Sequence, residues 1–191
     1  ADEPVDGILA ECSDGRLKIE DHRQGSKSRE DVYISLHIPT SMLFEDVDLK
    51  VDAGIIQTEC IMRTNTLVLK ADAGEITLDG INAEKLTASV GAGMIDIVNG
   101  DFGSLEMDCG VGEMDFEGSI QHDSKISCGM GAVDVMVYNG AENYNYVLDC
   151  GMGSIEIGDN SYSGVTKARR IDNGAEATLT LDCGMGEICI D

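Results

Sequence analysis

Acidic side chains recur at one fixed place in a short repeated motif of this 191-residue chain. The motif ends in Gly-x-Gly, and the residue three positions after its last glycine is acidic in four successive copies. These residues are Asp96, Asp115, Asp134 and Glu156. Carboxylates held side by side repel one another, which favours partial protonation or a bound cation. Because Ca²⁺ accepts several carboxylate oxygens, we predict that the four residues form a metal site, a ladder that holds Ca²⁺ weakly. No other cofactor is predicted.

Cysteine is the second residue type that could carry chemistry, and five of the seven cysteines share one motif position. They are Cys12, Cys109, Cys128, Cys150 and Cys183. Other copies have Val51, Ala71 and Val90 there, so the position calls for a small buried packing group. Zinc-binding C-x₂₋₄-C pairs are missing, which favours a column of reduced thiols. Cys189 lies between two isoleucines of the last alternating segment, so we expect it to face outward and to be the most reactive thiol.

The sequence predicts no catalytic site. The three histidines fall in unrelated repeats and form no triad with a serine. The glycine motif lacks the lysine or the helix N-terminus that a phosphate-binding loop requires. We therefore predict that the chain is not an enzyme.

The charge balance limits the partners. There are 36 acidic residues against 13 basic ones, a formal net charge of -23. Nucleic-acid binding needs a basic surface and is excluded, and an anionic membrane surface would repel the chain. No apolar run approaches the roughly 18 to 20 residues that span a bilayer, so we predict no membrane insertion of this segment. Since the sequence begins at Ala1, we expect a leader or an anchor to precede it.

The spacing of the motif predicts the fold. Its last glycines stand at positions 54, 74, 93, 112, 131, 153 and 186, in steps of 20, 19, 19, 19, 22 and 33. Apolar residues alternate with polar ones before and after each glycine, as in Leu67, Leu69 and Ala71 followed by Ile76 and Leu78. Two short strands around a corner cannot bury an apolar face alone, but stacked coils can. We predict an all-β fold, a single-stranded β-solenoid with about 19–22 residues per coil and parallel strand stacking.

This reading makes the chain one domain with four parts. They are irregular N-terminal coils and capping at 1–46, regular coils at 47–157, an inserted loop at 158–178 and a terminal coil at 179–191. Within the first part, Cys12-Ser13-Asp14-Gly15 reads as a degenerate motif copy, and the alternation from Val32 to Ile38 predicts a half-buried strand. The inserted loop carries a basic cluster of Lys167, Arg169 and Arg170. The last strand, 187–191, should be an exposed sheet edge.

Several segments resemble a known bacterial family of domains of unknown function that carries the label adhesin. They are Ile38-Pro39, the corner Asp52-Ala53-Gly54, the run from Tyr144 to Ile155, and the ending from Leu181 to Ile188. The resemblance extends over nearly the whole chain. It implies a β-solenoid, often behind an N-terminal anchor, in envelope or surface proteins, and it implies no catalytic residues.

The leading functional expectation is a non-catalytic display or binding module of the bacterial cell envelope or surface, with an unidentified protein or glycan ligand. The alternative is an intracellular or membrane-associated scaffold that assembles end to end with further copies through its terminal coils. A third reading is a carbohydrate-active solenoid enzyme, which would use paired carboxylates in a surface groove.

Overall fold

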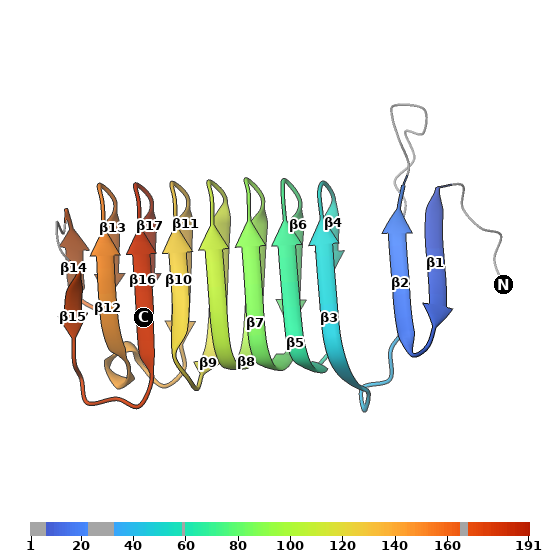
Figure 1. Cartoon of the computed structure of the whole chain (residues 1–191), viewed down its shortest axis with the longest axis horizontal. Coiled ribbons are helices and arrows are strands. Elements are labelled where there is room, and N and C mark those ends of the chain that lie inside the picture. Colours follow the sequence, from blue (N-terminus) through green and yellow to red (C-terminus); the bar gives the residue numbers. More distant parts are fainter. Residues whose placement is uncertain (1–6, 23–32, 59, 165–167) are drawn as a thin grey trace. The chain divides into compact units, whose positions relative to one another are not determined.

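The computed structural model describes residues 7–22, 33–58, 60–164 and 168–191 (Figure 1). They are strands and turns, apart from one short 3-10 segment at Ala141–Asn143. The chain divides into two compact units, residues 1–37 and 38–191, where the sequence predicted a single domain.

The first unit contains an antiparallel hairpin instead of a coil. Strands β1 (Ile8–Ser13) and β2 (Arg16–Asp21) pair through a two-residue turn at Asp14 and Gly15. Both turn residues have positive φ, 52° and 76°, as a tight hairpin turn requires. Cys12 is exposed, so the prediction that it joins a buried column is wrong.

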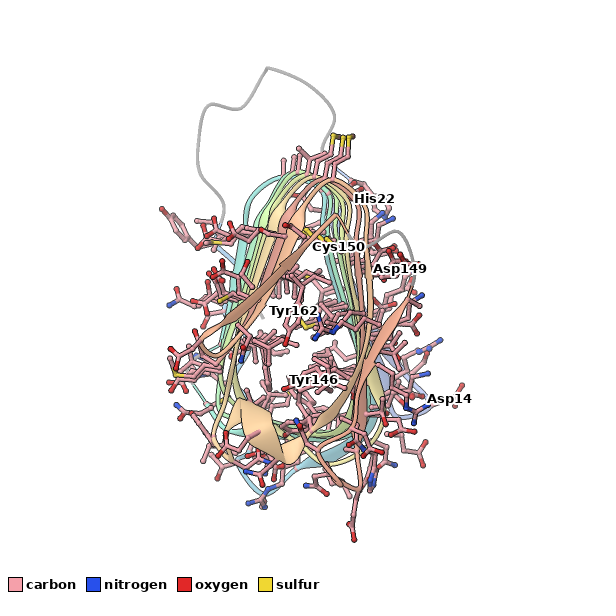
Figure 2. All side chains as sticks on the ribbon, turned by 90° about the vertical axis from the view of Figure 1, so that its left-hand side faces the viewer. Asp14, His22, Tyr146, Asp149, Cys150 and Tyr162 are labelled. Atoms are coloured by element: carbon pink, nitrogen blue, oxygen red, sulfur yellow. The ribbon has the colours of Figure 1, made fainter. Side chains whose placement is uncertain are left out.

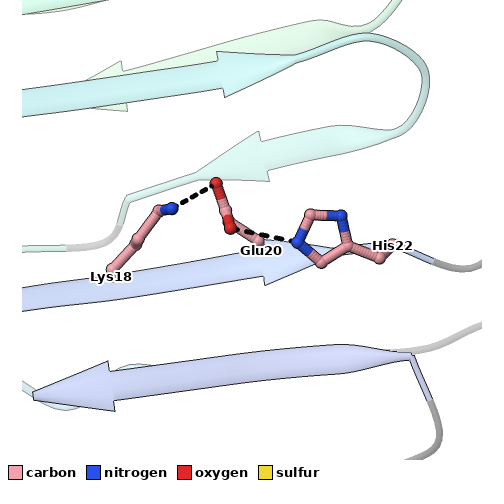
Figure 3. A network of polar contacts seen from close by, with 3 residues as sticks. All are labelled: Lys18, Glu20 and His22. Carbon is pink, nitrogen blue, oxygen red and sulfur yellow. Dashed lines mark hydrogen bonds and ion pairs between the residues drawn. The ribbon is translucent and has the colours of Figure 1, made fainter.

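A small polar network lies on one face of this hairpin (Figure 3). The Glu20 carboxylate accepts hydrogen bonds from Lys18 Nζ at 2.9 Å and from His22 Nε2 at 3.0 Å. The hydrogen bond from Lys18 is the main reason that the pKa of Glu20 lies below its usual value. All three groups reach solvent, so we expect little stabilisation from them.

The strand predicted from Val32 to Ile38 is not formed over its described part. Residues 33–38 carry no strand, and Tyr33 is 88% exposed. Val32 lies outside the described residues. Alternation supplies an apolar face, but a strand also needs a neighbouring backbone to pair with.

The second unit is the predicted β-solenoid, in which each coil has two strands separated by a glycine corner. The strands are β3 (Leu43–Val51), β4 (Ile55–Gln57), β5 (Met62–Ala71), β6 (Glu75–Asp79), β7 (Ile81–Val90), β8 (Met94–Cys109), β9 (Glu113–Ile120), β10 (Ser124–Cys128), β11 (Ala132–Val137), β12 (Asn145–Cys150), β13 (Ser154–Ile157), β16 (Thr178–Cys183) and β17 (Glu187–Ile190). Successive coils pair in parallel and in register, so the strands form two walls. The long strand β8 bends from one wall into the other.

The core fills the space between the two walls, which Figure 2 shows from the end of the stack. Equivalent side chains form columns, such as Leu67, Leu86 and Leu105 in adjacent register, and all three are buried. Tyr146 lies between the walls and is fully buried. Each large side chain taken out of water contributes about 1.5–3 kcal/mol, so the columns are the main source of stability.

The C-terminal coil does not lie at the end of the stack. Strand β16 pairs with β10 on one side and with β12 on the other, and β17 pairs with β11 and β13. The last coil in sequence therefore sits between two coils that precede it. The expectation that strand 187–191 is an exposed sheet edge is wrong, because both of its edges are paired.

The insertion at 158–178 forms the strands that flank the stack after β12 and β13. Strand β14 (Asn160–Ser163) pairs antiparallel with β13, and β15 (Arg169–Ile171) pairs antiparallel with β12. The Arg169 guanidinium lies 4.8 Å from the centre of the Tyr162 ring, which links the two strands. The segment is thus not simply the loop that the sequence predicted. Of its basic cluster, Lys167 lies outside the described residues.

Buried Asn145 fixes the path that leads the chain back into the stack. Its Oδ1 accepts a hydrogen bond from the Asn173 backbone N at 2.9 Å, and its Nδ2 donates to the Ala175 carbonyl at 2.7 Å. The Asn173 side chain in turn donates to the Tyr144 carbonyl at 2.8 Å. These bonds attach residues 173–175 to the start of β12, from where β16 enters between the coils.

Candidate functional site

One wall of the solenoid is acidic on its outer side. It consists of β4, β6, residues 94–98 of β8, β9, β11, β17 and β13, and we call its outer side the acidic wall. Its outward carboxylates are Glu75, Asp79, Asp96, Glu113, Asp115, Glu117, Asp134, Glu156 and Glu187. These strands contain no lysine or arginine. The ion pairs of the described solenoid residues, Lys50 with Asp52 and Lys70 with Asp72, lie elsewhere.

The predicted carboxylate ladder lies in the middle of this wall, with one change of order. Asp96, Asp115 and Asp134 are direct neighbours on β8, β9 and β11. Cys189 follows Asp134, and only then comes Glu156. The insertion of the C-terminal coil separates Glu156 from the three aspartates, so the predicted order is wrong at this point.

Burial and mutual repulsion raise the pKa values in the column. The pKa of Asp115 rises to about 6, first because the carboxyl is partly buried and then because Glu113, Asp134 and Asp96 surround it. The pKa of Asp96 is raised for the same reasons, with Glu75 and Glu117 as its charged neighbours. The column therefore favours a proton or a cation.

The column does not form a closed metal site. In the described part of the chain, no group of three or more His, Cys, Asp or Glu side chains is arranged to hold a metal ion. A shallow depression of about 240 Å³ runs past Asp96, Asp115, Asp134 and Cys189. Because the carboxylates stand in a line at the strand spacing of about 4.8 Å, a cation here would contact them in pairs.

The buried thiol column is present, in the order Cys109, Cys128, Cys183 and Cys150. Each of these thiols donates to the carbonyl of the glycine three residues further on, at 3.1–3.2 Å. Burial raises the pKa of Cys109 to about 11 and that of Cys183 to about 12. Buried and hydrogen-bonded to backbone carbonyls, these thiols serve packing, and all seven cysteines of the chain are free.

Cys189 faces outward as predicted, but its surroundings oppose the reactivity that we expected of it. Partial burial, followed by the charges of Asp191, Asp134 and Glu156, raises its pKa to about 11. Its Sγ lies 3.7 Å from Asp191 Oδ2. The thiolate is the nucleophile, so the neighbouring carboxylates make Cys189 a poor one.

Comparison with known protein families shows to which family the chain belongs. A family model described as Toastrack DUF4097 matches residues 8–169. The chain belongs to the Toastrack family. The match spans the hairpin and most of the solenoid, and the family is a domain of unknown function with a solenoid-like fold. This agrees with the β-solenoid domain of unknown function that the sequence suggested, while the family description says nothing of adhesion. No curated protein and no solved structure matches the chain.

The sequence did not suggest two further outward columns of this Toastrack domain, in which acidic residues alternate with other side chains. Glu75, Glu113 and Glu187 stand one position after the corner glycine, and Asp79 and Glu117 stand five positions after it. The residues of both columns point outward, as Asp115 does, so the alternation of the strands could have identified them.

Within the described residues, no helix is long and apolar enough to cross a membrane.

Because the pKa of Asp115 is raised, we predict that replacing this residue increases the stability of the fold, and that the increase depends on pH. The Asp115 carboxyl binds its proton more tightly in the folded state than in the unfolded chain, where its pKa is about 3.9. Stability therefore falls as pH rises from about 4 to about 6 and is constant above. Asp115→Asn removes this loss, and after discounting for solvent screening we expect a gain of about 1 kcal/mol at pH 7.5 and none at pH 4. Urea unfolding at both pH values measures it.

Glu106→Gln is the matched control for this prediction. Glu106 faces outward on the opposite wall, between Thr87 and Lys125. Without acidic neighbours on either side, its replacement should change stability little at both pH values. A gain of equal size at pH 4 and pH 7.5 for Asp115→Asn would show that charge repulsion is not the cause.

Proposed function

We propose that this Toastrack domain is a non-catalytic binding module of a bacterial envelope or surface protein, and that it presents the acidic wall to a cationic protein or glycan. The contrast between the two walls carries the proposal. Nine outward carboxylates share one wall that has no basic residue, whereas the opposite wall mixes acids with Lys50, Lys70, Lys85 and Lys125. A surface of one sign attracts partners of the other sign over several ångströms.

The architecture suits such a display role. In-register pairing holds each carboxylate at a fixed spacing from the next, and the filled core behind the wall resists deformation. A preorganised surface loses little freedom on binding, which favours affinity. The sequence resemblance described above supports the envelope or surface location, where the domain would act in an adhesin-like way.

A short basic peptide tests the proposal directly. We expect a fluorescent decalysine peptide to bind with a salt-dependent affinity and to shift amide NMR signals of β6, β9 and β11. The triple substitution Asp96→Asn, Asp115→Asn and Asp134→Asn should weaken binding about tenfold or more. The matched control neutralises Asp108, Asp149 and Asp182, which face outward on the opposite wall with the same total charge. If both triple variants lost the same affinity for the peptide, net charge alone would explain the binding, and the proposal would be overturned.

The proposal includes weak Ca²⁺ binding at Asp96, Asp115 and Asp134. Two neighbouring carboxylates can share one Ca²⁺, and relief of their repulsion would stabilise the fold. We expect millimolar Ca²⁺ to raise the melting temperature by a few degrees, and Asp115→Asn to abolish most of that rise. A titration with neither a thermal shift nor a calorimetric heat would rule the site out.

One observation favours the alternative of a scaffold that assembles end to end. Among the described residues, β3 is paired only with β5, and β4 only with β6. The inward residues Leu49 and Ile56 of this first coil are only half-buried, whereas Leu69 and Ile76 of the next coil are fully buried. Sedimentation over a range of concentrations tests this, and Leu49→Lys should abolish any association that it reveals.

A further inference from the structure

Methionine side chains stand at the outer tips of three neighbouring corners. Met130, Met185 and Met152 occupy the same place in the motif and are 56%, 53% and 81% exposed. Their order follows from the backbone. The Met185 N donates to the Gly129 carbonyl, and the Met152 N donates to the Gly184 carbonyl, both at 2.7 Å. Because each corner stacks directly on the next, we call these three residues the methionine ridge.

The ridge is a separate feature of the molecule. At the same motif position, the preceding corners carry Ala73, Ala92 and Val111. Sulfur therefore appears only in three corners that are adjacent in space, although Met152 and Met185 are far apart in the sequence. Figure 2 shows a row of sulfur atoms at this corner of the solenoid. The position is exposed, so packing against the core does not explain the choice of methionine.

The chemistry of three adjacent thioethers points to a soft metal ion. Thioether sulfur favours soft monovalent ions such as Cu(I), and it stays neutral and available at all pH values. The coil rise of about 4.8 Å is close to twice a metal–sulfur bond of about 2.3 Å, so one ion can bridge two neighbouring sulfurs. Methionine has three rotatable bonds with which to adjust the geometry. The strongly negative chain attracts cations to its surface.

We propose that Met130, Met185 and Met152 form a binding site for a soft monovalent cation of the Cu(I) class. The site is distinct from the acidic wall, whose oxygen ligands suit hard cations. Cys128, Cys183 and Cys150 stand two residues before the three methionines. These thiols point into the core, are buried, and donate to glycine carbonyls, so they are not its ligands.

Silver nitrate is the probe, because Ag⁺ has the same preference for sulfur and undergoes no redox cycling. Accessible thiols would compete, so the full chain carries Cys12→Ser, Cys60→Ser and Cys189→Ser. Methionine methyl groups labelled with ¹³C report on each site separately, and single leucine variants assign their signals. We expect Ag⁺ in chloride-free buffer to shift the three ridge signals together, with saturation at about one ion per chain.

Met136 gives the internal control, since it faces outward alone on β11 and is 54% exposed. Its signal should not move, and Met136→Leu should leave the affinity unchanged. The triple variant Met130→Leu, Met185→Leu and Met152→Leu should lose at least tenfold in affinity while keeping its melting temperature. Shifts of Met136 equal to those of the ridge, or an unchanged affinity in the triple variant, would overturn the site.

Discussion

A chain that ends at Ala177 will not fold cooperatively. The missing residues form β16 and β17, which pair with strands on both sides. Their inward side chains Leu179, Leu181, Ile188 and Ile190 are all 0% exposed. Burial of each contributes about 1.5–3 kcal/mol, so the coil supplies roughly 10 kcal/mol, as much as the whole stability of a typical domain. Its loss would also leave each of β10, β11, β12 and β13 with one unpaired edge.

Near-UV circular dichroism measures this result, because Tyr144 and Tyr146 are fully buried only in the assembled stack. We expect the truncated chain to lose their signal and to show no sharp urea transition. Leu181→Ala is a milder change. It should lower the free energy of unfolding by about 2–5 kcal/mol, while the urea transition stays sharp. Leu49→Ala, in the half-exposed first coil, should cost less. A truncated chain that unfolds sharply with a smaller denaturant dependence would place the coil at the end of the stack.

The order of the coils was hidden from the sequence for a physical reason. Alternation determines which side chains point inward, but it does not determine which coil lies next to which. Leu148 and Leu181 present the same apolar surface to a neighbour, so either coil could follow β10 and β11. What distinguishes the two is the anchoring of residues 173–175 by Asn145, a set of bonds between positions about 30 residues apart. No periodic pattern reports such bonds.

The N-terminal segment was misread because one local pattern has two meanings. Cys12-Ser13-Asp14-Gly15 fits the motif loosely, but Asp-Gly between alternating segments also favours a two-residue hairpin turn. The φ values of Asp14 and Gly15 show that the turn chemistry decided the structure. The corner glycines of the coils mostly lack positive φ, so the two kinds of glycine serve different purposes.

The site was only half predictable. The alternation of inward and outward side chains along each strand predicted that Asp96, Asp115 and Asp134 form one outward column. The register of the strands confirms this. The position of Glu156 depended on the coil order, which alternation does not encode. The behaviour of Cys189 depended on its burial and on Asp134 and Glu156 lying on either side of it. These are contacts between coils, and a single repeat does not reveal them.

Gly131→Ala will destabilise the domain by about 3 kcal/mol or more, a fall of roughly 10 °C in melting temperature. A Cβ at this position would lie 2.1 Å from the Gly112 carbonyl oxygen and 2.8 Å from Cys109 Sγ. That oxygen also accepts hydrogen bonds from the Ala132 N at 3.1 Å and from Cys109 Sγ at 3.2 Å. The oxygen cannot move away without breaking these bonds, so the two coils must separate. Thermal and urea unfolding measure the loss.

Gly158→Ala separates the two reasons for which a chain uses glycine. Gly158 has a φ of +51°, and a Cβ there would meet nothing within 4 Å. Its replacement should cost about 1 kcal/mol, from backbone strain alone. Gly131 shows no positive φ, so its larger cost would come entirely from the close approach of the neighbouring coil. The glycine that recurs at each corner is then explained by stacking, because a coil can lie directly on the next only where no side chain intervenes. Equal losses in the two variants would instead assign that role to backbone conformation.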